Sequence, residues 1–76
     1  MDAASSQPIA RVAQTVRKLR MAAGLSQEAL AERSEISTRY LQMIERGQSE
    51  PGLEVMCRIA DAMGMKPSAL LRRAGL

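Results

Sequence analysis

The sequence predicts an all-α fold, a compact bundle of five short helices. Apolar residues recur at steps of three and four along most of the chain, which is the spacing of amphipathic helices. Glycine and proline interrupt this spacing at several points and leave only short connections between the helical stretches. No stretch alternates apolar and polar residues as a half-buried strand does, so we expect helices packed on helices.

The first helix is expected over residues 8–23, with Pro8 in its first turn and Gly24 just after its end. Residues 1–7 are small and polar, which indicates a flexible N-terminal tail ahead of a domain spanning residues 8–76. The apolar face of this helix comprises Ile9, Val12, Ala13, Val16, Leu19 and Ala23.

Two shorter helices follow, each opened by a serine. Ser26 is a suitable N-cap for a helix over residues 27–34, and Ser37 for a helix over residues 38–46. Their inner positions are expected to be Leu30, Ala31, Leu41 and Ile44.

The C-terminal part predicts two further helices. A fourth helix ends before Gly64, and a fifth opens at Pro67 and runs through Leu71. Cys57, within the fourth helix, is expected to be a small core or interface residue. The apolar stripe of the fourth helix consists of Leu53, Met56, Ile59, Ala60 and Met63.

Composition excludes several classes of function. The 76 residues include no histidine and one cysteine, so the commonest general base, an internal disulfide and a cysteine-rich zinc site are all missing. We therefore expect no enzyme, no cofactor or metal and no small-molecule substrate. Neither an apolar run of about 18 residues nor the start of a signal peptide is present, which predicts a cytoplasmic protein without membrane contact.

The net charge of +3 is spread evenly along the sequence. Residues 1–36 carry five cations and four acids, residues 37–49 carry two and one, and residues 50–76 carry four and three. Each part is therefore +1, and no basic arm stands out. Charge alone does not carry a prediction of nucleic-acid binding.

Residues 26–46 predict a helix-turn-helix. The two helices are joined by about three residues, a link that favours a steep crossing over a long antiparallel contact. A third helix of this length is about 15 Å long and fits a major groove about 12 Å wide. Its outward face is expected to carry Thr38, Arg39, Gln42, Met43 and Arg46.

The segments LSQEALA (residues 25–31) and IERG (residues 44–47), with Pro51 and Leu53 after them, resemble the Cro/phage-repressor type of helix-turn-helix, the Xre family. The resemblance extends from about Val12 to Leu71 and implies a lambda-repressor-like fold. Phage repressors of this family dock on DNA with the second helix of the helix-turn-helix in the major groove.

The resemblance implies roles for individual residues. Gln27 matches a residue that binds a phosphate and braces the recognition helix, and Arg20 matches an arginine that pairs with Glu45 and lies against the DNA backbone. Arg46 matches either a phosphate contact or a simple cation at a helix C-terminus. The positions that face bases in the family are matched by Thr38, Arg39 and Met43. Positions nearer the DNA backbone or the groove wall are matched by Ser37, Tyr40 and Gln42, and Gln42 is also a candidate for contact with a base. The loop amides around Gln48 and Ser49 match a phosphate contact.

The sequence departs from the family pattern at three positions. Glu35 stands where the turn usually has glycine, which predicts either a strained left-handed residue or a different turn. Met43 lacks the hydrogen-bonding groups of the usual polar residue and suits a thymine methyl instead. Lys66 replaces the usual small cap of the last helix.

The function implied is that of a sequence-specific regulator that binds double-stranded DNA as a homodimer on a palindromic operator, with half-sites about 34 Å apart or a multiple of that distance. Controller proteins of restriction–modification systems are the first candidates, and Cro-like phage repressors or antitoxin-type autoregulators are alternatives. A protein-interaction module that has lost DNA binding is another. The dimer surface is expected in the C-terminal part, at Val55, Met65, Leu71 and Leu76.

Overall fold

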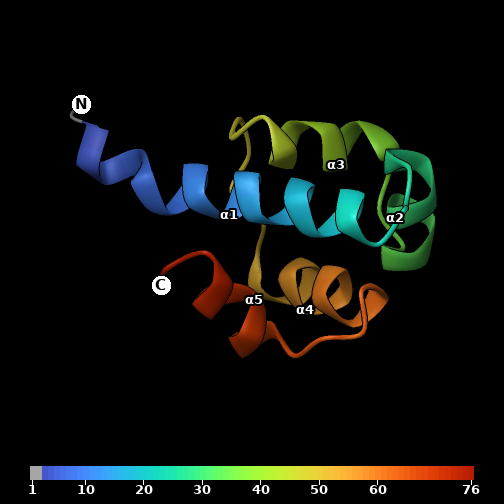
Figure 1. Ribbon diagram of the computed structural model, residues 1–76. Helices are drawn as coiled ribbons and strands as arrows, with labels where there is room; N and C mark the ends of the chain where they lie inside the picture. Colours follow the sequence, from blue (N-terminus) through green and yellow to red (C-terminus); the bar gives the residue numbers. More distant parts are fainter. Residues whose placement is uncertain (1–2) are drawn as a thin grey trace.

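The computed structural model describes residues 3–76, with side chains from Pro8 onward, and these residues contain helices and no strand (Figure 1). No helix in this part of the chain is long and apolar enough to pass through a membrane. The five helices are α1 (Ala3–Ala22), α2 (Gln27–Ser34), α3 (Thr38–Glu45), α4 (Leu53–Ala62) and α5 (Pro67–Arg73). The predicted all-α fold of five helices is confirmed.

The N-terminal end differs from the prediction. Helix α1 begins at Ala3, so residues 3–7 are helical instead of forming the expected tail, and residues 1–2 lie outside the described residues. Pro8 consequently lies inside α1 and not in its first turn. Proline favours a first turn because it has no backbone N–H to donate, but here a further turn of small residues precedes it at the cost of one backbone hydrogen bond.

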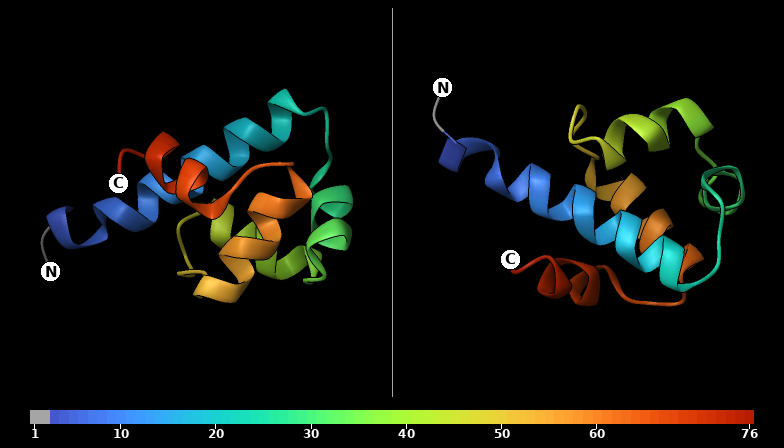
Figure 2. Two further views of the ribbon diagram at one scale, coloured as in Figure 1. Left: turned by 90° about the horizontal axis from the view of Figure 1, so that it is seen from below. Right: turned by 45° about the horizontal axis from the view of Figure 1, so that its top comes forward.

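Helix α1 is the centre of the arrangement. It packs against α3 on one side and α5 on the other, while α2 packs on α3 and α4, and α4 packs on α5. Figure 1 shows α3 above α1, with α4 and α5 below it. In the right view of Figure 2, α2 is seen along its axis while α3 lies across the view, so these two helices cross steeply as predicted.

The core lies where the inner faces of all five helices meet. The predicted inner positions are buried or half-buried, with three exceptions. Leu53 is 76% exposed because it is the first residue of α4, beyond the neighbouring helices. Cys57 is exposed, which excludes the core role expected for it and leaves the interface role as a prediction. Ala23 follows the end of α1 and is also exposed. The buried apolar residues are Val12, Ala13, Val16, Leu30, Ala31, Leu41, Ile44, Met56, Ile59, Ala60, Leu70 and Ala74.

Side-chain caps and one strained residue define the turn between α2 and α3. Ser26 accepts a hydrogen bond from the N–H of Ala29, and Ser37 accepts one from the N–H of Tyr40, each at 3.0 Å, as predicted. Glu35 adopts a left-handed conformation with φ 59° and ψ 42°. The turn therefore keeps the shape that suits glycine, and Glu35 carries a strain of about 1–2 kcal/mol.

Candidate nucleic-acid interface

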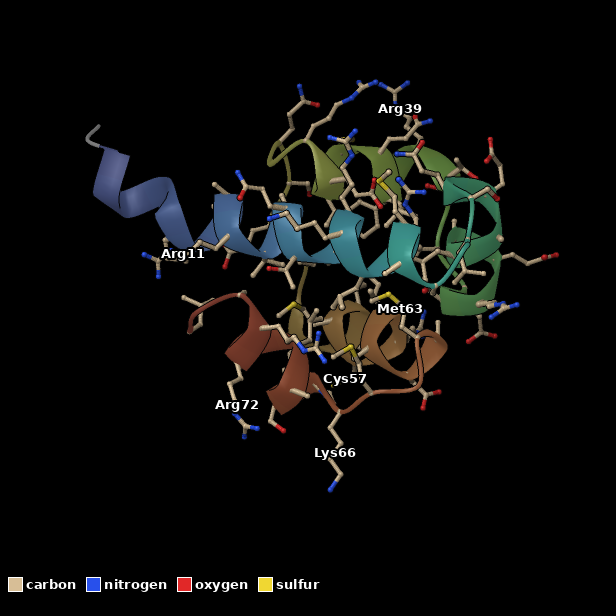
Figure 3. All side chains as sticks on the ribbon, viewed as in Figure 1. Arg11, Arg39, Cys57, Met63, Lys66 and Arg72 are labelled. Atoms are coloured by element: carbon tan, nitrogen blue, oxygen red, sulfur yellow. The ribbon has the colours of Figure 1, made fainter. Side chains whose placement is uncertain are left out.

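Helix α3 has one buried face and one outward face. Leu41 and Ile44 are fully buried and fix the helix on the core. The labelled Arg39 extends from α3 away from the other helices (Figure 3). On the outward face, Arg39 and Arg46 are exposed, whereas Thr38, Gln42 and Met43 are half-buried.

A buried ion pair joins α1 to the end of α3. Arg20 donates from Nε to Oε2 of Glu45 at 2.7 Å and from Nη2 to Oε1 at 3.1 Å, so the contact is bidentate. The two side chains are only 12% and 3% exposed. Arg20 also donates from Nη1 to the carbonyl of Leu25 at 2.9 Å. One guanidinium therefore holds the turn before α2 and the C-terminal end of α3, in the pairing that the family resemblance implies.

Gln27 extends this pair to the outward face of α3. Its Nε2 donates to Oε1 of Glu45 at 3.0 Å, and its Oε1 accepts a hydrogen bond from Nε2 of Gln42 at 3.3 Å. Gln27 thus braces α3, and one of its two amide N–H groups remains for another acceptor. Its contact with a phosphate stays a prediction.

Three arginines surround a hollow beside this network. Arg17, Arg20 and Arg46 line it together with Gln27 and Glu45. The carboxylate of Glu45 is already paired, so the balance of charge at the opening is positive. Arg17 was missed by the sequence reasoning, although it precedes Arg20 by three residues and so shares its side of α1.

Other candidate contact residues already form hydrogen bonds or packing contacts within the chain. The Ser37 hydroxyl accepts the N–H of Tyr40, and Tyr40 is half-buried against the core. The backbone N–H of Gln48 donates to the carbonyl of Met43 at 2.9 Å. The Gln48 N–H is therefore already bonded within the chain, while its side chain is exposed. A phosphate contact at Gln48 and Ser49 stays a prediction.

The four residues predicted for a dimer surface differ in exposure, and their shared role stays a prediction. Val55, Met65 and Leu71 are half-buried against the core, whereas Leu76 is 52% exposed. Met65 lines a hollow with Cys57, and none of the other three lines that hollow. Leu71 and Leu76 instead line an apolar hollow of about 160 Å³, which Pro8, Ile9, Val12, Glu50, Pro51 and Met56 complete.

The described residues hold no group of three or more His, Cys, Asp or Glu side chains placed to bind a metal ion. What they hold is a short helix with an outward polar and cationic face, crossed steeply by a preceding helix and fixed by a buried pair. This combination defines a helix-turn-helix domain.

Comparison with known proteins identifies the family. A model described as Helix-turn-helix matches residues 16–70. The chain belongs to this Xre-type helix-turn-helix family, HTH_3, whose members are transcriptional regulators.

Two relatives and two solved structures illustrate the similarity. An uncharacterised HTH-type transcriptional regulator of Mycobacterium tuberculosis is 39% identical over 61 residues, covering 80% of this chain and 44% of that protein. The immunity repressor of Bacillus phage phi105 is 35% identical over 60 residues, covering 79% of this chain and 42% of that protein. The chain thus spans less than half the length of these relatives.

Among solved structures, the restriction-modification controller protein C.AhdI from Aeromonas hydrophila is 37% identical, with a TM-score of 0.79 over 82% of this chain and 94% of that chain. The clp gene regulator ClgR from Corynebacterium glutamicum is 28% identical, with a TM-score of 0.85 over 90% of this chain and 72% of that chain.

Proposed function

We propose that this chain is a sequence-specific regulator that binds double-stranded DNA with α3 in the major groove. The observation that carries the proposal is the network from Arg20 through Glu45 and Gln27 to Gln42. This network joins α3 to α1 and α2. The side chains of Thr38 and Arg39 form no hydrogen bond with the described residues. A rigid helix with free donors on its outer face suits the reading of base edges.

The placement of the side chains supports a division of roles. Arg39, exposed near the start of α3, suits a bidentate contact with O6 and N7 of guanine. Met43 suits the methyl group of thymine, and Thr38 and Gln42 complete the reading face. Arg17, Arg20 and Arg46 surround a hollow that suits a backbone phosphate, which would set the register of the protein on the duplex.

Substitution of Arg39 tests this reading. Arg39→Ala is expected to lose about 1–3 kcal/mol of binding free energy on the operator and to relax one base position. Arg33→Ala, which removes an exposed cation on α2, is the matched control and should change binding little. Affinities for operator and random duplexes are measured by fluorescence anisotropy at several salt concentrations. Equal losses of Arg39→Ala on both duplexes would make Arg39 a phosphate contact and refute its assignment.

A single domain of this kind contacts few base pairs, so the proposal includes a homodimer on a palindromic operator. The apolar hollow lined by Leu71 and Leu76 supports this part, because burying it would enlarge the small core of each chain. Sedimentation analysis is expected to give a dimer, and Leu76→Glu, at a 52% exposed position, should dissociate it without unfolding. A monomer at high concentration that still binds one complete operator would refute the dimer.

The similarity to C.AhdI supports the narrower proposal of a restriction–modification controller, since it covers 94% of that chain and leaves little of it unmatched. Selection of bound duplexes from a random pool should recover two inverted half-sites about 34 Å apart. We expect such sites near the gene for this chain and beside restriction and methyltransferase genes. Their absence from that position would favour a phage-type repressor.

A further inference from the structure

Helices α1 and α5 carry cations and no acid. Residues 3–27 and residues 62–76 contain no aspartate or glutamate. The two helices pack against each other, as the left view of Figure 2 shows. Figure 3 shows Arg11 extending from α1 and Arg72 extending from α5, with Arg72 directed away from α1. The cations of the two segments are Arg11, Arg17, Lys18, Arg20, Lys66, Arg72 and Arg73.

Three neighbouring hollows connect these cations to α3. The first lies between α1 and the end of α5 and is lined by Arg11, Lys18 and Arg73, with Gln14 at its edge. The second lies between α1 and the end of α3 and shares Gln14 with the first. Arg46 lines the second and also the third, which is the hollow of Arg17 and Arg20 described above. We call the continuous surface of Arg11, Gln14, Arg17, Lys18, Arg46 and Arg73 the basic belt.

Nothing within the described residues neutralises the basic belt. Among the side chains from Pro8 onward, Glu45 is the only acid that borders these hollows, and it is 3% exposed and paired with Arg20. Arg11 donates from Nη1 to the carbonyl of Gly75 at 3.3 Å, which uses one of its five N–H donors. Neither Lys18 nor Arg73 forms an ion pair within residues 3–76. Like charges gathered without a counter-charge favour the approach of a polyanion.

The residues that line the basic belt indicate which kind of polyanion it would bind. The hollow between α1 and α5 has no large apolar side chain, since Thr15, Ala74 and Gly75 complete its wall. An acidic protein partner would normally bury an apolar centre in its interface, whereas contact with a nucleic-acid backbone needs only donors and positive charge. The belt also begins at Arg46 and Arg17, directly beside the face proposed to read bases.

We propose that the basic belt binds backbone phosphates of the same duplex outside the groove occupied by α3. This inference rests on the proposed function. A duplex seated on α3 meets the near end of the belt first, and its flank reaches Arg11, Lys18 and Arg73 only by curving toward α1 and α5. The belt would therefore favour bent operators and make affinity depend on flanking DNA of any sequence.

The test compares a short duplex that covers only the selected site with a long duplex that adds about ten base pairs on each side. The belt variant combines Arg11→Gln, Lys18→Gln and Arg73→Gln. Its matched control combines Arg33→Gln, Lys66→Gln and Arg72→Gln, which removes the same charge from exposed positions outside the belt. Circular dichroism melting checks that both variants remain folded.

The wild-type protein should bind the long duplex more tightly than the short one, and the belt variant should bring this affinity ratio close to one. The salt dependence on the long duplex should weaken, with the slope of log K against log salt falling by about 0.9 for each phosphate that the variant no longer neutralises. The control variant should keep both the ratio and the slope. Equal affinity of the wild type for the two duplexes, or equal effects of the two variants, would overturn the belt alone. Absence of binding to any duplex would overturn the proposed function as well.

Discussion

Replacing Glu45 by glutamine probes the network that fixes α3. The change keeps the shape of the side chain but removes its charge. It also turns an NH₂ group toward donors, because the Glu45 carboxylate accepts hydrogen bonds from Arg20 Nε at 2.7 Å, Arg20 Nη2 at 3.1 Å and Gln27 Nε2 at 3.0 Å. Glu45→Gln therefore leaves the Arg20 guanidinium without its counter-charge.

The burial of the pair sets the expected magnitude. Breaking a buried ion pair by removing one partner costs about 3–5 kcal/mol. Arg20 keeps 12% of its side chain exposed and can recover some hydration, so the lower end applies, about 3 kcal/mol. A chain of this length has a free energy of unfolding of roughly 4–11 kcal/mol. Glu45→Gln should therefore lower Tm by roughly 12–24 °C.

The chain offers a control of the same chemistry in a different environment. Arg58 also donates to a glutamate, Glu54, but these side chains are 40% and 77% exposed. Glu54→Gln should change the free energy of unfolding by about 0.5 kcal/mol or less. Urea unfolding followed by circular dichroism measures both variants. A loss below about 1 kcal/mol for Glu45→Gln, or equal losses for the two variants, would refute the reasoning that burial makes this pair matter.

Three further changes address the turn between α2 and α3, each measured by the urea midpoint at unchanged slope. Glu35→Gly should stabilise the domain by about 1 kcal/mol, because φ is 59° at this residue; a lower midpoint would show that the Glu35 side chain contributes more than its strain costs. Ser34→Ala should also stabilise it by about 1 kcal/mol, since the buried Ser34 hydroxyl finds no hydrogen-bond partner among residues 3–76; destabilisation would reveal a partner. Ser37→Ala should destabilise it by about 1 kcal/mol through loss of the N-cap of α3, and an unchanged midpoint would contradict the capping role.

The helices could be predicted closely because strong local signals mark their ends. Ser26 and Ser37 open α2 and α3, and Gly24, Gly47 and Gly64 follow the ends of three helices with φ of 72° each. The start of α1 had no such marker. Pro8 is compatible with a first turn, but nothing in the preceding small residues stops a helix from continuing backwards through them.

Burial was harder to predict where helical spacing and position in the bundle disagree. Leu53 precedes Met56 by three residues and shares its side of α4, yet it is exposed because no helix covers the first turn. Ser34 shows the reverse case, a polar side chain that is fully buried at the end of α2. Spacing gives the direction in which a side chain points, but not whether another element stands there.

The candidate site was only partly accessible to sequence reasoning. The pair of Arg20 and Glu45 and the bracing role of Gln27 came from the family resemblance, and the structure contains both contacts. The hydrogen bond from Gln42 to Gln27 came from neither spacing nor resemblance, since it depends on how two flexible side chains meet across a helix crossing. The hydrogen bond from the Gln48 N–H to the carbonyl of Met43 was also not predicted, because it depends on the path of the loop after α3.

The charge of the chain shows how the order of residues can hide a surface. Dividing the sequence into consecutive parts gave +1 for each, because the acids in every part offset all but one of its cations. The fold then sorts these segments in space: α1 and α5, from opposite ends of the sequence, pack together, while most exposed acids lie on α2 and α4. A count for each helix would have revealed two acid-free segments, but only their packing makes them one surface. The relevant quantity for binding DNA is thus the charge presented on each face, and on the face of α1 and α5 it is entirely positive.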